Sequence, residues 1–112
     1  MIALENVYGN LVSMAELAKV NNIKVIFCSV MPAYDFPWRP GMKPADKVIQ
    51  LNKWIKEYAD KNGLTYVDYH SAMKDERNGL PANLSKDGVH PTLEGYKIME
   101  KIVLEAIHKT VK

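Results

Sequence analysis

Apolar positions along the chain follow two different spacings, and these predict an alternation of helices and strands. Spacings of three and four residues predict helices over residues 4–20, over about 44–62, and from 93 to the C-terminal end. Nearly continuous β-branched and aromatic runs predict strands at 23–30 and 64–69, the first of them buried on both faces. Helices that alternate with strands favour a parallel sheet with right-handed crossovers. We therefore expect an α/β fold with about two parallel strands and three main helices.

Prolines, glycines and polar residues separate these elements. Residues 32–41 are rich in proline and aromatic residues and have no regular period, so we expect a loop there. This loop follows a parallel strand, at the edge where open α/β sheets bind ligands. Residues 70–89 are also polar, with room for one helical turn at 70–74, and Thr92 is the expected N-cap of the last helix.

A sheet of only two parallel strands leaves open edges. Parallel strands are normally covered on both faces and flanked by other strands. We therefore expect the edge of strand 23–30 to be covered by a second copy of the chain. This would produce a homo-oligomer, either by edge contact or by exchange of an element such as the N-terminal helix.

Composition narrows the class of protein. The 112 residues are 47% hydrophobic and 25% charged, which is typical of one globular domain. The net charge of +2 is too small to favour nucleic acid as the main partner. No apolar run approaches the roughly 20 residues of a membrane-spanning helix, and no signal peptide is visible. Cys28 is the single cysteine, so it cannot form an internal disulfide, and we expect a buried, unreactive thiol.

The segment 84–92, with the sequence Leu-Ser-Lys-Asp-Gly-Val-His-Pro-Thr, places an aspartate three residues before a histidine. A hydrolytic triad needs an imidazole that accepts a proton from a nucleophile, and a carboxylate that holds this imidazole in the correct tautomer. Because Gly88 relaxes the backbone, Asp87 can fold back to accept a hydrogen bond from Nδ1 of His90. The alternative is an ordinary turn in which these two residues make only local hydrogen bonds.

Residues 87–96 resemble the last conserved block of the SGNH/GDSL hydrolase family, the GDSL-like lipases and acylhydrolases. That block has the form Asp-x-x-His-Pro, followed by a small polar residue and a helix start that contains glycine. The order of the preceding strands and helix also fits, so the resemblance covers the chain from Leu11 onward. It implies a flavodoxin-like three-layer α/β/α fold and hydrolysis of a small acyl ester, such as an acetyl ester of a sugar, through a Ser-His-Asp triad. In this triad His90 would be the general base and Asp87 the residue that orients it.

The nucleophile and oxyanion blocks of that family do not occur in this sequence. The family carries its serine in a Gly-Asp-Ser block and an oxyanion-hole asparagine before an aspartate, and neither Gly-Asp-Ser nor Asn-Asp is present. None of the serines at 13, 29, 71 and 85 is predicted at the sharp strand-to-helix turn that exposes a nucleophile. We therefore expect residues 1–112 to be the C-terminal portion of a single hydrolase domain and to be inactive alone. The alternative is a non-catalytic α/β module for binding or assembly.

The remaining candidate residues are aromatic or could bind a metal. Tyr34 and Trp38, together with Phe36, could line an acyl or sugar pocket or could cover the end of the sheet, and both interpretations stay open. The carboxylates and histidines at positions 68, 70, 87 and 90 could in principle converge on a metal ion. Their spacing does not match a helical pair of ligands, so we expect no metal and no cofactor.

Overall fold

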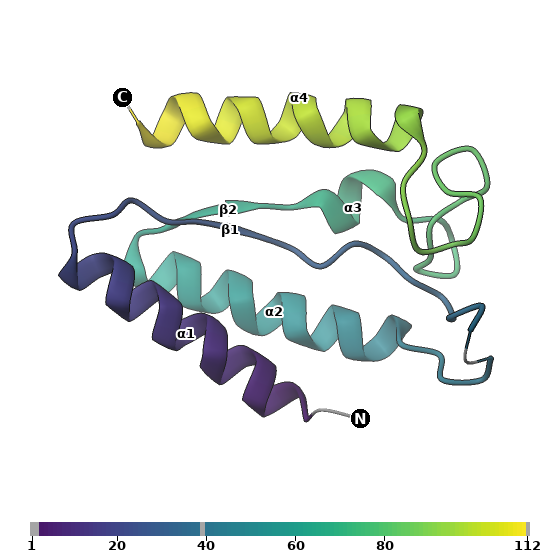
Figure 1. The fold of residues 1–112 in the computed structure, drawn as a ribbon, viewed down its shortest axis with the longest axis horizontal. Helices are drawn as coiled ribbons and strands as arrows, with labels where there is room; N and C mark the ends of the chain where they lie inside the picture. Colours follow the sequence, from purple (N-terminus) through teal and green to yellow (C-terminus); the bar gives the residue numbers. More distant parts are fainter. Residues whose placement is uncertain (1–2, 39, 112) are drawn as a thin grey trace.

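The computed structural model describes residues 3–38 and 40–111, which form three layers (Figure 1). In chain order the elements are α1 (Leu4–Val20), β1 (Ile26–Cys28), α2 (Ala45–Asn62), β2 (Thr65–Val67), α3 (Tyr69–Met73) and α4 (Leu93–Thr110). The strands β1 and β2 form a parallel sheet, with α4 on one face and α1 and α2 on the other. The expected α/β/α class, with two parallel strands and three main helices, is confirmed. None of the described helices is long and apolar enough to cross a membrane.

The helices begin and end where the local sequence favours it. Gly63 follows α2 with a φ of +68°, the left-handed conformation that glycine adopts most easily after a helix. Thr92 caps α4 as expected, because its Oγ1 accepts a hydrogen bond from the Gly95 N–H at 3.4 Å. The helical turn expected after the second strand is α3, and the Asp68 carboxylate caps it by accepting a hydrogen bond from the Ser71 N–H at 3.0 Å. Each cap sets the residue at which the chain enters or leaves a helix.

The sheet is shorter and more exposed than the sequence predicts. The strands pair only Ile26–Cys28 with Thr65–Val67, whereas the sequence predicts strands over 23–30 and 64–69. The expectation that the first strand is buried on both faces is wrong, and Cys28 is exposed rather than buried. The physical reason is that β2 is the only strand beside β1 in the described part of the chain, so one edge of β1 lacks a neighbour.

Just after β1, a side-chain amide of α2 makes the backbone hydrogen bonds that a neighbouring strand would otherwise make. Oδ1 of the buried Asn52 accepts a hydrogen bond from the Val30 N–H at 2.7 Å, and its Nδ2 donates to the Val30 carbonyl at 3.0 Å. Both backbone groups of Val30 are thereby paired, as they would be in a sheet. This anchors the start of the loop after β1 to α2.

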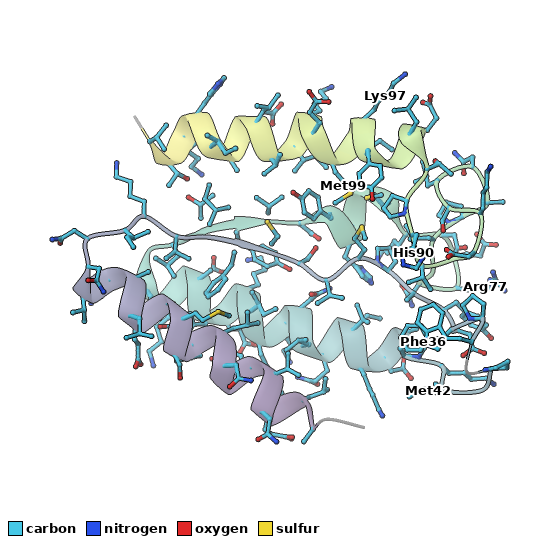
Figure 2. All side chains as sticks on the ribbon, viewed as in Figure 1. Phe36, Met42, Arg77, His90, Lys97 and Met99 are labelled. Carbon is cyan, nitrogen blue, oxygen red and sulfur yellow. The ribbon has the colours of Figure 1, made fainter. Side chains whose placement is uncertain are left out.

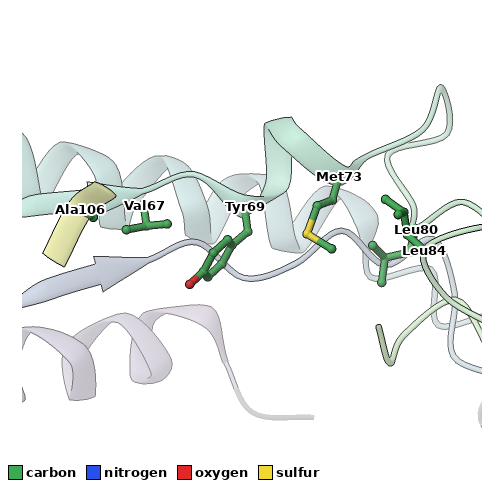
Figure 3. Close-up of a cluster of buried hydrophobic side chains, with 6 residues drawn as sticks. All are labelled: Val67, Tyr69, Met73, Leu80, Leu84 and Ala106. Atoms are coloured by element: carbon green, nitrogen blue, oxygen red, sulfur yellow. The ribbon is translucent and has the colours of Figure 1, made fainter. Parts of the chain in front are cut away.

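The main cluster of buried hydrophobic side chains lies between the segment of β2 and α3 and the helix α4 (Figure 3). It consists of Val67, Tyr69, Met73, Leu80, Leu84 and Ala106, with Ile98, Met99, Ile102 and Val103 of α4 packed against it. Both leucines of the cluster come from the loop between α3 and α4, so burial of their side chains anchors that loop to the core.

The apolar residues whose spacing predicts α4 do not all face the core. Leu93, Tyr96 and Ile107 are exposed, and 70% of the Leu93 surface is accessible. A helix turns by about 100° per residue, so these three positions lie on the face opposite to Ile102. Apolar residues therefore occur on both faces of α4, and only one face packs on the sheet in the described structure.

Candidate active site

The loop between α3 and α4 closes on itself over residues 84–92. The Thr92 N–H donates a hydrogen bond to the Leu84 carbonyl at 2.7 Å. Ser85 and Pro91 form an isolated antiparallel bridge just inside this pair. The residues between them therefore form a compact loop with fixed ends, and Thr92 leads directly into α4.

Asp87 and His90 lie side by side in this loop, in the contact that the sequence predicts. The distance between Oδ2 of Asp87 and Nδ1 of His90 is 2.6 Å. The other carboxylate oxygen, Oδ1, accepts hydrogen bonds from the backbone N–H groups of His90 at 2.8 Å and Val89 at 2.9 Å. Gly88 has a φ of +83°, the left-handed conformation that lets the chain turn back toward Asp87. The imidazole faces solvent, with 72% of the His90 side chain exposed.

The surroundings of Asp87 keep its carboxyl group ionised. The backbone N–H of His90 contributes most to lowering the pKa of Asp87 far below its ordinary value, followed by the His90 side chain and the backbone N–H of Val89. An ionised carboxylate accepts the Nδ1–H of the imidazole, which leaves a free lone pair on Nε2. This nitrogen can then take a proton from a nucleophile, as a general base must.

Ser85 fixes the shape of the loop from its buried side. Only 2% of Ser85 is exposed. Its Oγ lies 2.8 Å from the His90 carbonyl oxygen and 3.1 Å from Oδ1 of Asp87, and it accepts a hydrogen bond from the Gly88 N–H at 2.9 Å. A hydroxyl surrounded by these partners positions the loop and is not free to act as a nucleophile. This role is not predictable from the sequence, because it depends on how the loop closes.

Aromatic side chains from the loop after β1 gather at the same end of the molecule as His90, and Figure 2 shows Phe36 and Arg77 there. The ring centroid of Trp38 is 6.2 Å from that of His90. Phe36 stacks on Trp38 at 5.1 Å, with the two ring planes 12° apart. The guanidinium carbon of Arg77 lies 4.5 Å from the ring centroid of Tyr34. Of the two expected substrate-binding residues, Trp38 thus lies beside His90.

Tyr34 lines a cavity of about 290 Å³ between the two loops. The wall of this cavity also contains Phe36, Arg77, Leu80, Asp87 and Gly88. A group bound here would lie against the loop that holds Asp87 and His90. Arg77 has no signal in the sequence, because its contact with Tyr34 joins two loops that only the fold brings together.

The other polar candidates do not form a second site in the described structure. Among residues 3–38 and 40–111, no group of three or more His, Cys, Asp and Glu side chains is placed to hold a metal ion, so the possible convergence of residues 68, 70, 87 and 90 is not found. His70 is buried, and its backbone N–H donates to Oγ of Ser29 at 3.0 Å. Burial lowers the pKa of His70, so that its imidazole is held in the neutral form. Ser29 therefore has a structural role, whereas Nε2 of the His70 imidazole is buried without a hydrogen-bond partner among the described residues.

Comparison with known proteins gives consistent matches. A sequence model described as the GDSL-like Lipase/Acylhydrolase family matches residues 2–98. Similar solved structures include a candidate acylhydrolase of Bacteroides fragilis, with 44% identity and a TM-score of 0.96, and a GDSL-like lipase of Bacteroides thetaiotaomicron, with 47% identity and a TM-score of 0.93. These alignments cover 100% and 97% of this chain but only 55% and 54% of the solved ones. An acetylxylan esterase of Xylanibacter ruminicola is 29% identical over 85 residues, which make up 75% of this chain and 16% of that protein. The chain thus spans about half the length of the two solved structures.

Proposed function

Because the chain belongs to the GDSL-like Lipase/Acylhydrolase family, we propose that it carries the acid–base part of an ester-hydrolysing site, with His90 as general base and Asp87 as the residue that orients it. The observation that supports this most directly is the 2.6 Å contact between Oδ2 of Asp87 and Nδ1 of His90, beside an open cavity. The similarity to an acetylxylan esterase supports acetyl esters as the substrate class.

In the proposed reaction a serine hydroxyl attacks the carbonyl carbon of the ester, while Nε2 of His90 takes the hydroxyl proton. The tetrahedral intermediate collapses, the bond to the alcohol oxygen breaks, and the alcohol leaves with the proton from His90. Water then attacks the acyl-serine and gives one proton to Nε2, which returns it to the serine as acetic acid departs and ionises in water. Asp87 stabilises the imidazolium in both steps without itself taking a proton.

The serine in this scheme comes from outside the described chain. Ser29 and Ser85 are buried, with their hydroxyls engaged in hydrogen bonds, while Ser13 and Ser71 lie on α1 and α3. The sequence also contains no Gly-Asp-Ser. We therefore infer that residues 1–112 are the C-terminal portion of one hydrolase domain, whose remaining part supplies the nucleophile and the oxyanion hole. On this basis the chain alone is inactive, because oxyanion stabilisation is usually the largest contribution to such catalysis.

A chimaeric protein tests the proposal. The 112-residue chain alone is expected to hydrolyse p-nitrophenyl acetate no faster than free imidazole does. The same chain is then joined to the part of the Bacteroides fragilis structure that has no counterpart here, and this chimaera is expected to be active. Substitution His90→Ala should lower kcat by about 10²- to 10⁴-fold, the usual contribution of a general base. The matched control is His108→Ala, in the last turn of α4, which should leave kcat unchanged.

Two outcomes would reject this proposal. A folded chimaera whose activity is unaffected by His90→Ala would show that His90 is not the base. A folded chimaera with no hydrolysis of any acyl ester would favour the alternative, a non-catalytic α/β module for binding or assembly.

The open edge of β1 supports a second proposal, self-association of the isolated chain. In the described structure β1 has a neighbouring strand on one side only, and the apolar residues Ile23 and Val30 near its ends are exposed. Contact with a second copy, at the edge or by exchange of α1, would cover both. Light scattering is expected to give the mass of a dimer or larger species. A folded monomer at high concentration would contradict this.

A further inference from the structure

We infer that Trp38 is a platform for a sugar ring in the alcohol part of the ester, so that the substrate is an acylated carbohydrate. The inference rests on the proposed ester hydrolysis and adds the chemical class of the alcohol. Its first support is that 59% of Trp38 is exposed, although the ring lies beside His90. Large apolar surface left in water next to a candidate general base suggests a ligand that covers it.

The loop that carries Trp38 is held in place by its own hydrogen bonds. The Asp35 carboxylate accepts bonds from the backbone N–H groups of Gly41 at 2.8 Å, Phe36 at 2.9 Å and Lys43 at 3.0 Å. The N–H of Gly41 contributes most to lowering the pKa of Asp35, and hydrogen bonds to an ionised carboxylate are stronger than neutral ones. A flat surface that is fixed before binding loses less entropy when a ligand arrives.

The neighbouring loop adds a second constraint on the same segment. A Cβ atom added to Gly79 would lie 2.8 Å from the Cβ of Tyr34, so only glycine allows the two loops to approach this closely. Arg77 covers the Tyr34 ring from the same loop. The segment that leads to Trp38 is thus fixed at Tyr34 by packing and at Phe36 by the Asp35 carboxylate.

The geometry of the aromatic pair fits a ring-shaped ligand near the reacting atoms. Phe36 stacks on one face of the Trp38 indole, and more than half of the Trp38 surface stays exposed. A pyranose ring can lay its C–H face on an indole at van der Waals distance, about 4 Å. With the Trp38 and His90 centroids 6.2 Å apart, an acetyl group on such a ring would extend toward the imidazole.

The polar groups in the cavity beside the Phe36–Trp38 pair favour a sugar over an apolar chain. Phe36 also lines the cavity whose wall includes the Arg77 guanidinium and the Asp87 carboxylate. A long acyl chain would remove water from these charged groups without replacing their hydrogen bonds, which is costly. Sugar hydroxyls can replace those bonds while the ring's C–H face covers the aromatic surface.

Binding of an unacetylated sugar to the 112-residue chain tests the inference without any chemistry. Xylohexaose is titrated into the protein by isothermal calorimetry, with hexanoate as the competing apolar probe. We expect saturable binding of xylohexaose, at least tenfold weaker in Trp38→Ala, which corresponds to about 1.4 kcal/mol. Trp38→Phe keeps a flat aromatic face and should recover most of the affinity. Trp54→Phe is the matched control, because the other tryptophan of the chain packs on Tyr8 between α1 and α2.

Several results would overturn the inference. These are equal affinity in the wild type and Trp38→Ala, no binding of xylohexaose, or binding of hexanoate in its place. A urea denaturation midpoint that matches the wild type checks that Trp38→Ala is folded. The assay needs neither a nucleophile nor an ester bond. Sugar binding without hydrolysis in the chimaera would therefore reject only the proposed function, and hydrolysis of aryl acetates without sugar binding would reject only the platform.

Discussion

Replacing Ser85 with alanine removes one oxygen atom from the loop over residues 84–92 and tests whether this loop as a whole positions His90. Two backbone groups lose a partner: the Gly88 N–H, now 2.9 Å from Oγ, and the His90 carbonyl, now 2.8 Å from it. A buried polar group left without a partner costs about 1–3 kcal/mol. Because the outer side of this loop is open to water, we take the lower end for each group and expect a total loss of about 2 kcal/mol.

Thermal unfolding measures this loss. For a chain of this size 1 kcal/mol lowers Tm by about 4 °C, so Ser85→Ala should unfold roughly 8 °C below the wild type. All variants are compared at one protein concentration, because the Tm of a self-associating chain depends on concentration. Ser13→Ala, at an exposed position of α1, is the control and should change stability by less than about 0.5 kcal/mol.

A second measurement separates the position of His90 from overall stability. The Nδ1 proton of His90 lies in the 2.6 Å contact between Nδ1 and Oδ2 of Asp87. It should exchange faster with water in Ser85→Ala, because the loop loosens. Equal stability of Ser85→Ala and Ser13→Ala, together with an unchanged Nδ1 proton signal, would refute the assigned role of Ser85. The carboxylate of Asp87 would then suffice to hold the imidazole.

Two further predictions concern glycine and histidine positions. Gly88→Ala should destabilise the chain by about 1–2 kcal/mol, because φ is +83° there. Gly9→Ala should stabilise the chain by about 1 kcal/mol, because alanine favours a helix more than glycine does and the added Cβ in α1 meets no neighbour. Urea unfolding checks that the two changes in stability have opposite signs. Burial and, second, the charge of Lys74 lower the pKa of His70 below its ordinary value of 6.5. As the pH falls, the imidazole therefore takes up a proton in the unfolded chain before it does so in the folded chain, which favours unfolding. The urea midpoint should therefore fall from about pH 7 to pH 5, and His70→Gln should reduce that fall; an unchanged pH dependence would refute this.

The helices were predictable because their signals are local. The predicted end of the first helix at residue 20 is the observed end of α1, and Asn22 just beyond it has a φ of +58°. The caps at Gly63 and Thr92 likewise depend only on residues within a few positions along the chain. Side-chain spacing and capping chemistry therefore suffice where no distant contact is needed.

The burial of strand and helix faces was less predictable, because it depends on neighbours that apolar spacing does not identify. Cys28 lies in an apolar run but is exposed, since β1 has one neighbouring strand in the described structure. Leu93 and Tyr96 continue the apolar pattern of α4 and yet point away from the sheet. An apolar residue shows that burial is favourable, but not which surface, if any, is there to bury it.

The same distinction applies to the candidate site. Asp87 and His90 are three residues apart, and the bonds that join them lie within residues 84–92. Burial of Leu84 anchors this loop to the core without help from another domain. The dyad can therefore form even where the proposed nucleophile lies outside residues 1–112, and its geometry would be the same in an active enzyme and in an inactive module. Under the proposed function, activity depends on whether a serine and its oxyanion donors are brought to Nε2 of His90, which is why the chimaera, rather than any substitution within the loop, is the decisive experiment.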